Sequence, residues 1–137
     1  MRVFLDTNVL VSAFATRGLC ADVLRLTLSE HDLVLGTVVV AELRRVLLGK
    51  IKLPKAQWSA IEAFLREHEV VARPRKAPSI RVRDASDRWI LATAIAAKAD
   101  VLVTGDRDLL DVAGESPVRI LTPREFWALV RAKPREH

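Results

Sequence analysis

The stretch Val3-Phe-Leu-Asp-Thr-Asn-Val-Leu10 joins a short apolar run to three polar residues and then to a second apolar run. An apolar run that stops at a carboxylate is typical of a short buried strand. Asp6 stands where an N-cap would precede a helix that starts near Asn8. Because a strand followed directly by a helix is the repeating unit of parallel sheets, this stretch predicts an α/β fold.

Similar apolar runs recur along the chain. They predict further strands at Leu33 to Leu35, Val101 to Val103 and Val118 to Leu121. Between the second and third predicted strands, apolar side chains recur at helical spacing over Val39 to Leu47 and again over Trp58 to Leu65. We expect each of these two helices to bury its apolar stripe against the sheet or a neighbouring helix.

The composition limits what kind of protein this is. The chain has 137 residues, 50% of them hydrophobic, which fits one domain with one core and excludes a disordered chain. Lys and Arg number 22 against 17 Asp and Glu, so the net charge is +5 and an anionic partner is expected. The longest uncharged run, Thr7 to Thr16, is far shorter than the roughly 20 residues of a membrane span. A single cysteine, Cys20, excludes an internal disulfide and favours a cytoplasmic setting.

The domain organisation is simple. We expect one domain over residues 1–132 and a polar tail over residues 133–137. Arg73 to Pro78 contains two prolines and three basic residues, and we interpret it as a connector between a helical half and the later βα units. Thr122-Pro-Arg-Glu125 has the spacing of a capping box with proline in the first turn, so a last helix should begin there.

Acidic residues stand at or near the predicted ends of strands and starts of helices, the edge where α/β sheets bind ligands. They are Asp6, Glu42, Asp84 with Asp87, and Asp106. Each alone can be an N-cap, a turn residue or a solvated charge. Together, carboxylates about 4 Å apart repel each other by about 4 kcal/mol at an effective dielectric near 20, so a converging set calls for a cation. Oxygen ligands favour Mg²⁺ or Mn²⁺ over zinc.

Four segments resemble the motifs of PIN-domain ribonucleases, in order and in spacing. They are Phe4-Leu-Asp-Thr-Asn-Val-Leu10, Val40-Ala-Glu-Leu43, Asp84-Ala-Ser-Asp-Arg-Trp-Ile-Leu-Ala-Thr-Ala94 and Leu102-Val-Thr-Gly-Asp-Arg-Asp-Leu-Leu110. Within that family the chain is similar to VapC-type toxins of bacterial and archaeal toxin–antitoxin pairs. The resemblance implies a three-layer α/β/α sandwich with a mostly parallel five-stranded sheet. It also implies a divalent-metal site that cuts single-stranded RNA, leaving a 5′-phosphate and a 3′-hydroxyl.

The resemblance also assigns residues. The acidic quartet of the family is matched by Asp6, Glu42, Asp87 and Asp106. Accessory positions that line the site are matched by Asn8, Thr104, Asp84 and Asp108. We assign Asp6 and Asp106 to direct ligation of Mg²⁺ or Mn²⁺, Asp87 to the same or a second metal, and Glu42 to positioning or deprotonating the attacking water. Val40 departs from the pattern, since many members have Ser or Thr there.

Two basic segments without acidic residues, 43–61 and 70–83, are candidate tracks for the phosphates of RNA. We assign RNA contacts within them to Arg44, Arg45, Arg73, Arg75 and Lys76. Ordinary solvated helix faces and loops explain the same residues equally well. The chain has no tyrosine, and Trp58 and Trp127 are better interpreted as core, so the sequence offers little for base stacking.

Other functions fit less well. A phosphatase with an aspartate nucleophile after the first strand needs a second Asp where Asn8 stands, and no glycine-rich turn follows that strand to bind a dinucleotide. The main alternative to a ribonuclease is a non-catalytic PIN scaffold that binds RNA or a protein partner. By analogy with the family we expect a small antitoxin protein as partner and a homodimer, with the helix at Trp58 to Leu65 forming either the interface or plain core.

Overall fold

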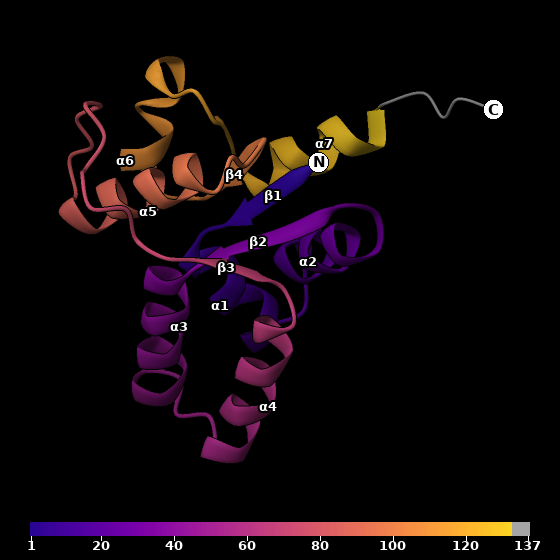
Figure 1. The fold of residues 1–137 in the computed structure, drawn as a ribbon. Helices are drawn as coiled ribbons and strands as arrows, with labels where there is room; N and C mark the ends of the chain where they lie inside the picture. The colour runs from indigo at the N-terminus through magenta and orange to yellow at the C-terminus, as the bar shows by residue number, and fades with distance from the viewer. Residues whose placement is uncertain (133–137) are drawn as a thin grey trace.

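The computed structural model describes residues 1–132, so the predicted tail at 133–137 lies outside the described residues. One five-stranded sheet has the strand order β3-β2-β1-β4-β5 (Figure 1). The strands are β1 Arg2–Leu5, β2 Asp32–Gly36, β3 Glu69–Val71, β4 Val101–Val103 and β5 Arg119–Leu121. Every neighbouring pair is parallel, which confirms the predicted α/β class.

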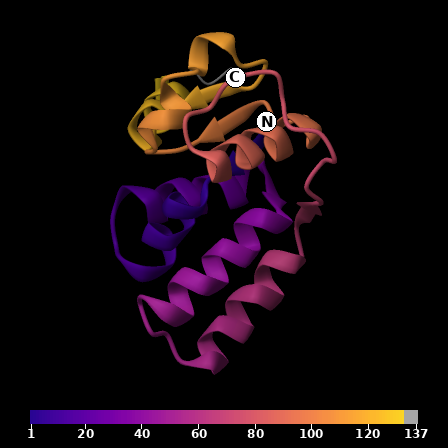
Figure 2. The same cartoon turned by 90° about the vertical axis from the view of Figure 1, so that its left-hand side faces the viewer.

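Helices cover both faces of this sheet. They are α1 Thr7–Ala15, α2 Leu19–Glu30, α3 Thr37–Gly49, α4 Lys55–Arg66, α5 Ala85–Ala96, α6 Arg107–Leu110 and α7 Pro123–Ala132. In Figures 1 and 2, α1 to α4 lie on one side of the strands and α5 with α6 on the other. Right-handed crossovers require this, because the chain moves outward from β1 to β3 and then returns past β1 to β4. No helix within residues 1–132 is long and apolar enough to cross a membrane.

Four of the five strands coincide with the apolar runs of the sequence, within a residue or so at each end. The exception is β3, which the sequence did not predict. This strand has three residues, pairs only with β2 at the edge of the sheet, and has no fully buried side chain. A short edge strand that is only half-covered needs no continuous apolar run, and so it leaves little signal in the sequence.

The predicted helix stripes and the capping box are present. Val39, Leu43 and Leu47 of α3 are buried, as are Trp58 and Leu65 of α4. Within the last helix, the Glu125 carboxylate accepts from the backbone N–H of Thr122 at 2.9 Å and the Thr122 hydroxyl accepts from that of Glu125 at 3.0 Å. Because Trp58 and Leu65 pack inside the chain, the core interpretation holds for these two side chains.

Gly36 ends β2 where that strand passes closest to α5. A Cβ atom at Gly36 would lie 2.7 Å from Cγ2 of Thr93 and 3.2 Å from Cζ of Phe4. Both neighbours are fully buried, and the Thr93 hydroxyl donates to the backbone carbonyl of Trp89 at 2.7 Å. Only glycine therefore lets α5 approach the sheet this closely at Thr93.

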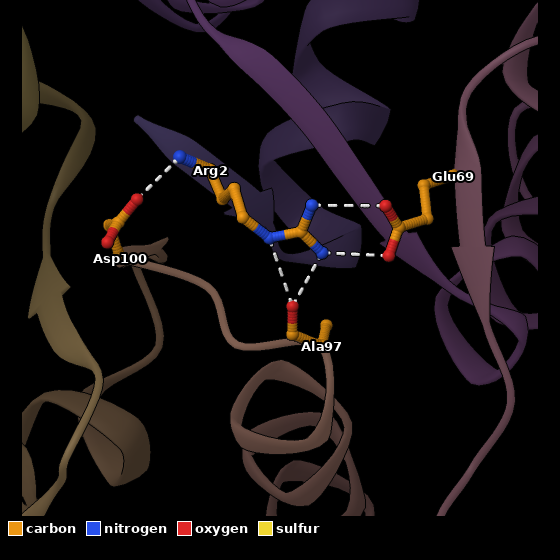
Figure 3. Close-up of polar contacts among 4 residues, drawn as sticks. All are labelled: Arg2, Glu69, Ala97 and Asp100. Atoms are coloured by element: carbon orange, nitrogen blue, oxygen red, sulfur yellow. Dashed lines mark hydrogen bonds and ion pairs between the residues drawn. The ribbon is translucent and has the colours of Figure 1, made fainter.

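At the amino ends of the strands, Arg2 contacts three other parts of the chain (Figure 3). Its guanidinium donates to both carboxylate oxygens of Glu69, at 3.1 and 2.7 Å, and to the carbonyl of Ala97 beyond the end of α5, at 2.6 and 3.2 Å. Its backbone N–H donates to Asp100 at 2.7 Å. The hydrogen bonds from Arg2 lower the pKa of Glu69. These contacts fix α5 at its far end, away from the carboxyl ends of the strands.

Candidate active site

Three of the acidic residues predicted for the site cap helices at the carboxyl edge of the sheet. Asp6 precedes α1 and accepts from the backbone N–H of Thr7 at 2.7 Å. Asp84 precedes α5 and Asp106 precedes α6, and each accepts backbone N–H groups of its own helix. The N-cap interpretation of these residues is therefore correct. Capping is not the only feature of these residues, because their carboxylates also lie near one another at the carboxyl edge of the sheet.

Asp6 is the most deeply placed of these carboxylates. The residue is 2% exposed, and burial raises the pKa of its side chain to about 6. Hydrogen bonds from Thr104 and Thr7 lower this pKa, whereas the negative charges of Glu42 and Asp106 raise it further. The structure thus brings three members of the predicted quartet, from β1, α3 and the β4–α6 turn, within electrostatic reach of one another.

Asp87, the fourth member, caps no helix and lies in the first turn of α5, 7% exposed. Burial raises the pKa of its carboxyl group well above the usual range. A hydrogen bond with Asp106 and the charges of Asp106, Asp6 and Asp84 raise it further. A solvated first-turn aspartate would show neither effect, so Asp87 is the residue that a purely structural explanation accounts for least.

The accessory acids belong to the same region. Asp84, Asp87 and Asp108 each place a carboxylate oxygen within 4.8 Å of the other two. Asp84 is exposed, Asp87 is buried and Asp108 is half-buried. The structure therefore brings all six predicted acidic residues together. Asn8 differs from them, because it carries no charge and is exposed in the first turn of α1.

Thr104 joins two of the carboxylate positions. Its fully buried hydroxyl donates to Oδ2 of Asp6 at 2.6 Å and accepts from the backbone N–H of Asp106 at 2.9 Å. The two strands involved, β1 and β4, are neighbours, and the backbone N–H of Asp6 donates to the carbonyl of Val103. This is the point where the strand order reverses, the place where open α/β sheets form ligand sites.

Glu42 lies on α3 and is close enough to Asp6 for its charge to raise the pKa of that residue. Its side chain is 28% exposed and lies 3.6 Å from the guanidinium of Arg45, one turn further along the helix. Val40, two residues before Glu42, is buried and offers no hydroxyl to it. The arginine balances Glu42 only in part, because a long pair with one exposed partner is weak.

The donor set fits a hard divalent cation. It consists of carboxylate oxygens, and burial together with the charges of neighbouring acids raises the pKa values of Asp6 and Asp87. Next to Asp6, the buried hydroxyl of Thr7 has no hydrogen-bond partner among the described residues. Buried polar groups normally find a partner, and carboxylates crowded in this way bind Mg²⁺ or Mn²⁺ in proteins.

Two of the basic residues predicted to contact RNA border this region. The five predicted RNA contacts are all exposed, namely Arg44, Arg45, Arg73, Arg75 and Lys76. Two of them, Arg45 and Arg73, line a cavity of about 320 Å³ that also includes Glu42 and Trp89. The sequence analysis assigned no role to Trp89. Trp58 is core as expected, and Trp127 is half-buried against the core.

The fold and the site together define an α/β protein with a carboxylate-rich centre at the switch point of a parallel sheet. The family model described as PIN domain matches residues 2–108. The chain therefore belongs to the PIN domain family, which confirms the resemblance drawn from its motifs.

Solved structures give the same fold. One match is a crystal structure of VapBC2 from Rickettsia felis bound to a DNA fragment from their promoter, with a TM-score of 0.62 and 23% identity over 88% of this chain and 97% of that chain. Another is VapBC-1 from nontypeable Haemophilus influenzae, with a TM-score of 0.61 and 19% identity over 90% of this chain and 99% of that chain. No curated protein sequence gives a significant match.

Proposed function

We propose that this protein is a divalent-metal-dependent endoribonuclease that cuts single-stranded RNA. The observation that carries the proposal is the convergence of six carboxylates on one edge of the sheet, with the pKa values of Asp6 and Asp87 both raised. Membership of the PIN domain family supports it. The net charge of +5 suits a polyanionic substrate.

In this proposal Asp6, Asp87 and Asp106 hold Mg²⁺ or Mn²⁺. When bound, the metal supplies a Lewis acid that lowers the pKa of water and offsets charge on the phosphate. Glu42 is half-exposed and stands at the border between the carboxylates and the neighbouring cavity, so it is suited to orient the attacking water and accept its proton. Thr104 fixes the Asp6 carboxylate and the start of α6.

The basic residues around the centre would hold the RNA backbone. Five exposed residues carry positive charge, which attracts the phosphates that the acidic centre without its metal would repel. They are Arg44, Arg45, Arg73, Arg75 and Lys76. Contacts to phosphate position a nucleic acid without taking part in the chemistry. Substitution of these residues should therefore change RNA affinity more than the rate of the bound complex.

We further propose that the protein acts in the cytoplasm as the toxin of a toxin–antitoxin pair, bound by a small antitoxin and forming a homodimer. The likeness of its fold to two VapBC complexes supports this. A dimer would have to use side chains other than Trp58 and Leu65, which are buried within the chain. Copurification from the native host tests both partners, and recovery of a lone monomer would contradict both.

The alternative is a PIN scaffold that binds RNA or protein without cutting. A cleavage assay separates the two proposals. Purified protein should cut an unstructured RNA with Mg²⁺ or Mn²⁺, fail in EDTA, and leave duplex RNA intact. Asp87→Asn should be inactive, whereas Asp32→Asn, an exposed residue at the opposite edge of the sheet, should cut like the wild type. Absence of EDTA-sensitive cutting across a broad panel of RNAs would favour the scaffold.

A further inference from the structure

The cavity beside the carboxylates lies between α3 and α5 and has a volume of about 320 Å³. Arg45 and Glu42 line it from α3, and Ser86, Trp89 and Ile90 line it from α5. Arg73, from the segment before α5, completes the wall. Small-molecule sites in proteins begin at about 300 Å³, so the cavity is large enough for one small group rather than for a folded element.

The walls of the cavity combine an aromatic ring with positive charge. The guanidinium carbon of Arg73 lies 4.2 Å from the ring centroid of Trp89, which makes a cation–π pair. A planar guanidinium over an aromatic ring can continue a stack of further rings. Arg45 is largely exposed and pairs with Glu42 only at 3.6 Å, so its donors are available to an anion. Aromatic rings interleaved with cations are what proteins use to hold single-stranded nucleic acid.

The cavity adjoins the acidic centre. Glu42 belongs to both, since it lines the cavity and its charge raises the pKa of Asp6. On α5, the backbone N–H of Ser86 donates to Asp84, and the next residue is Asp87. A nucleotide whose phosphate lies at the carboxylates therefore has the cavity as the neighbouring space for its base.

We propose that this cavity binds one unpaired nucleobase of the RNA next to the bond that is cut. The base stacks on the Arg73–Trp89 pair, and Arg45 contacts a neighbouring phosphate. This inference rests on the proposed ribonuclease function and adds a physical reason for single-strand selectivity. A base within a duplex is stacked on both faces and paired along its edge, so it enters such a cavity only after it has been unpaired.

The test measures binding of a short single-stranded RNA in EDTA, where no cutting is expected. Trp89→Leu keeps an apolar wall but removes the ring, and Arg73→Gln removes the charge from an exposed residue. Each should weaken binding, Trp89→Leu by roughly 5- to 100-fold, the range for loss of one base–aromatic stack. The matched controls are Trp127→Leu and Arg131→Gln, because these residues form the same kind of pair on α7 with Trp127 lining a separate cavity. They should bind RNA like the wild type.

A second arm replaces single nucleotides of the RNA with abasic ones. One abasic position should weaken binding to the wild type about as much as Trp89→Leu does, and it should weaken binding to Trp89→Leu no further. Full additivity of the two changes, or wild-type affinity of both Trp89→Leu and Arg73→Gln, would overturn the proposal. Cleavage is measured separately on the same oligonucleotides. If the protein cuts RNA but the two changes are additive, the ribonuclease proposal stands and the base site is excluded. If the two changes are not additive but the protein does not cut, the cavity binds a base and the ribonuclease proposal is excluded.

Discussion

The hydroxyl of Thr104 donates to Oδ2 of Asp6 at 2.6 Å, which connects the carboxyl ends of the two central strands β4 and β1. The same hydroxyl accepts the backbone N–H of Asp106 at 2.9 Å. One buried side chain therefore orients a carboxylate from one strand and the turn that carries a second carboxylate. The relationship makes Thr104 a positioning residue for the acidic centre.

Thr104→Val should separate this role from simple packing. Loss of the hydroxyl removes one of the two hydrogen bonds that orient the Asp6 carboxylate, and the bond from the backbone N–H of Thr7 remains. We therefore expect Mg²⁺ affinity or activity to fall about 10- to 100-fold, the range for loss of a ligand's hydrogen-bonding partner. Thr27→Val is the matched control, because Thr27 is also fully buried and its hydroxyl bonds only the carbonyl of Val23 within α2. Metal titration monitored by thermal melting checks the result. Equal Mg²⁺ affinity in both variants would remove Thr104 from the centre.

The stability of the metal-free protein should fall as the pH rises. The pKa of Asp6 is raised to about 6, and the pKa of Asp87 is also raised above 3.8, the ordinary value. Between the unfolded and folded pKa values the folded protein binds more protons than the unfolded chain, so the free energy of unfolding decreases with pH. At about 1.4 kcal/mol per pKa unit, Asp6 alone should make the protein about 1 kcal/mol more stable at pH 5 than at pH 8.

Denaturant unfolding in EDTA across that pH range provides the measurement. Asp6→Asn is the reference, because asparagine keeps the N-cap but does not titrate, and the difference between the two proteins isolates the Asp6 contribution. Saturating Mg²⁺ should reverse the trend, since protons and metal compete for the same oxygens. Parallel pH profiles of wild type and Asp6→Asn in EDTA would contradict the raised pKa.

Gly36→Ala should destabilise the protein through α5. The added methyl group meets the buried side chains of Thr93 and Phe4, and overpacking of this kind costs about 1 to 3 kcal/mol. Gly49→Ala is the control, because a Cβ atom there meets nothing within 4 Å and the residue ends α3. Chemical denaturation compares the two. Equal stabilities would mean that β2 and α5 do not approach each other as closely as described.

The basic segment before α5 should contribute to RNA affinity through charge. The combined change of Arg73, Arg75 and Lys76 to Ala should weaken binding and reduce the slope of log affinity against log salt by about 2, given roughly 0.7 per phosphate contact with a single strand. Lys98→Ala, an exposed residue beyond the far end of α5, should leave the slope unchanged. An unaltered slope in the triple variant would exclude this segment from the binding surface.

The sequence predicted the architecture well because its signals are local. Three of the four predicted strands are continuous apolar runs at the centre of the sheet. Asp6 follows one such run directly and Asp106 follows another after Thr104 and Gly105, which places both carboxylates at one edge. The N-cap and metal-site interpretations are compatible, because one geometry allows both. A helix that starts at the end of a strand has its N-cap residue at the carboxyl edge of the sheet, where α/β proteins bind ligands.

Other features depend on contacts between distant segments and left no local pattern. The edge strand β3 forms because it pairs with β2, and this pairing places Glu69 opposite Val34, which is distant in the sequence. The cavity at Trp89 forms only when Arg73 folds over the ring from the preceding loop. Likewise the close grouping of Asp108 with Asp84 and Asp87 requires α5 and α6 to meet. These relationships become visible only in three dimensions.

The central claim is that the carboxylates form a divalent-metal centre, and Asp87→Asn tests it most directly. Asp87 caps no helix, so its replacement removes a carboxyl group whose ionisation is opposed by burial and by neighbouring acids, without removing a cap. In EDTA the variant should be more stable than the wild type by about 1 kcal/mol or more. Saturating Mg²⁺ at about 100 times its dissociation constant should stabilise the wild type by about 2.7 kcal/mol and the variant far less. Thermal melts of both proteins with and without Mg²⁺ provide the measurement. A variant that is less stable in EDTA, yet stabilised by Mg²⁺ as much as the wild type, would contradict the claim.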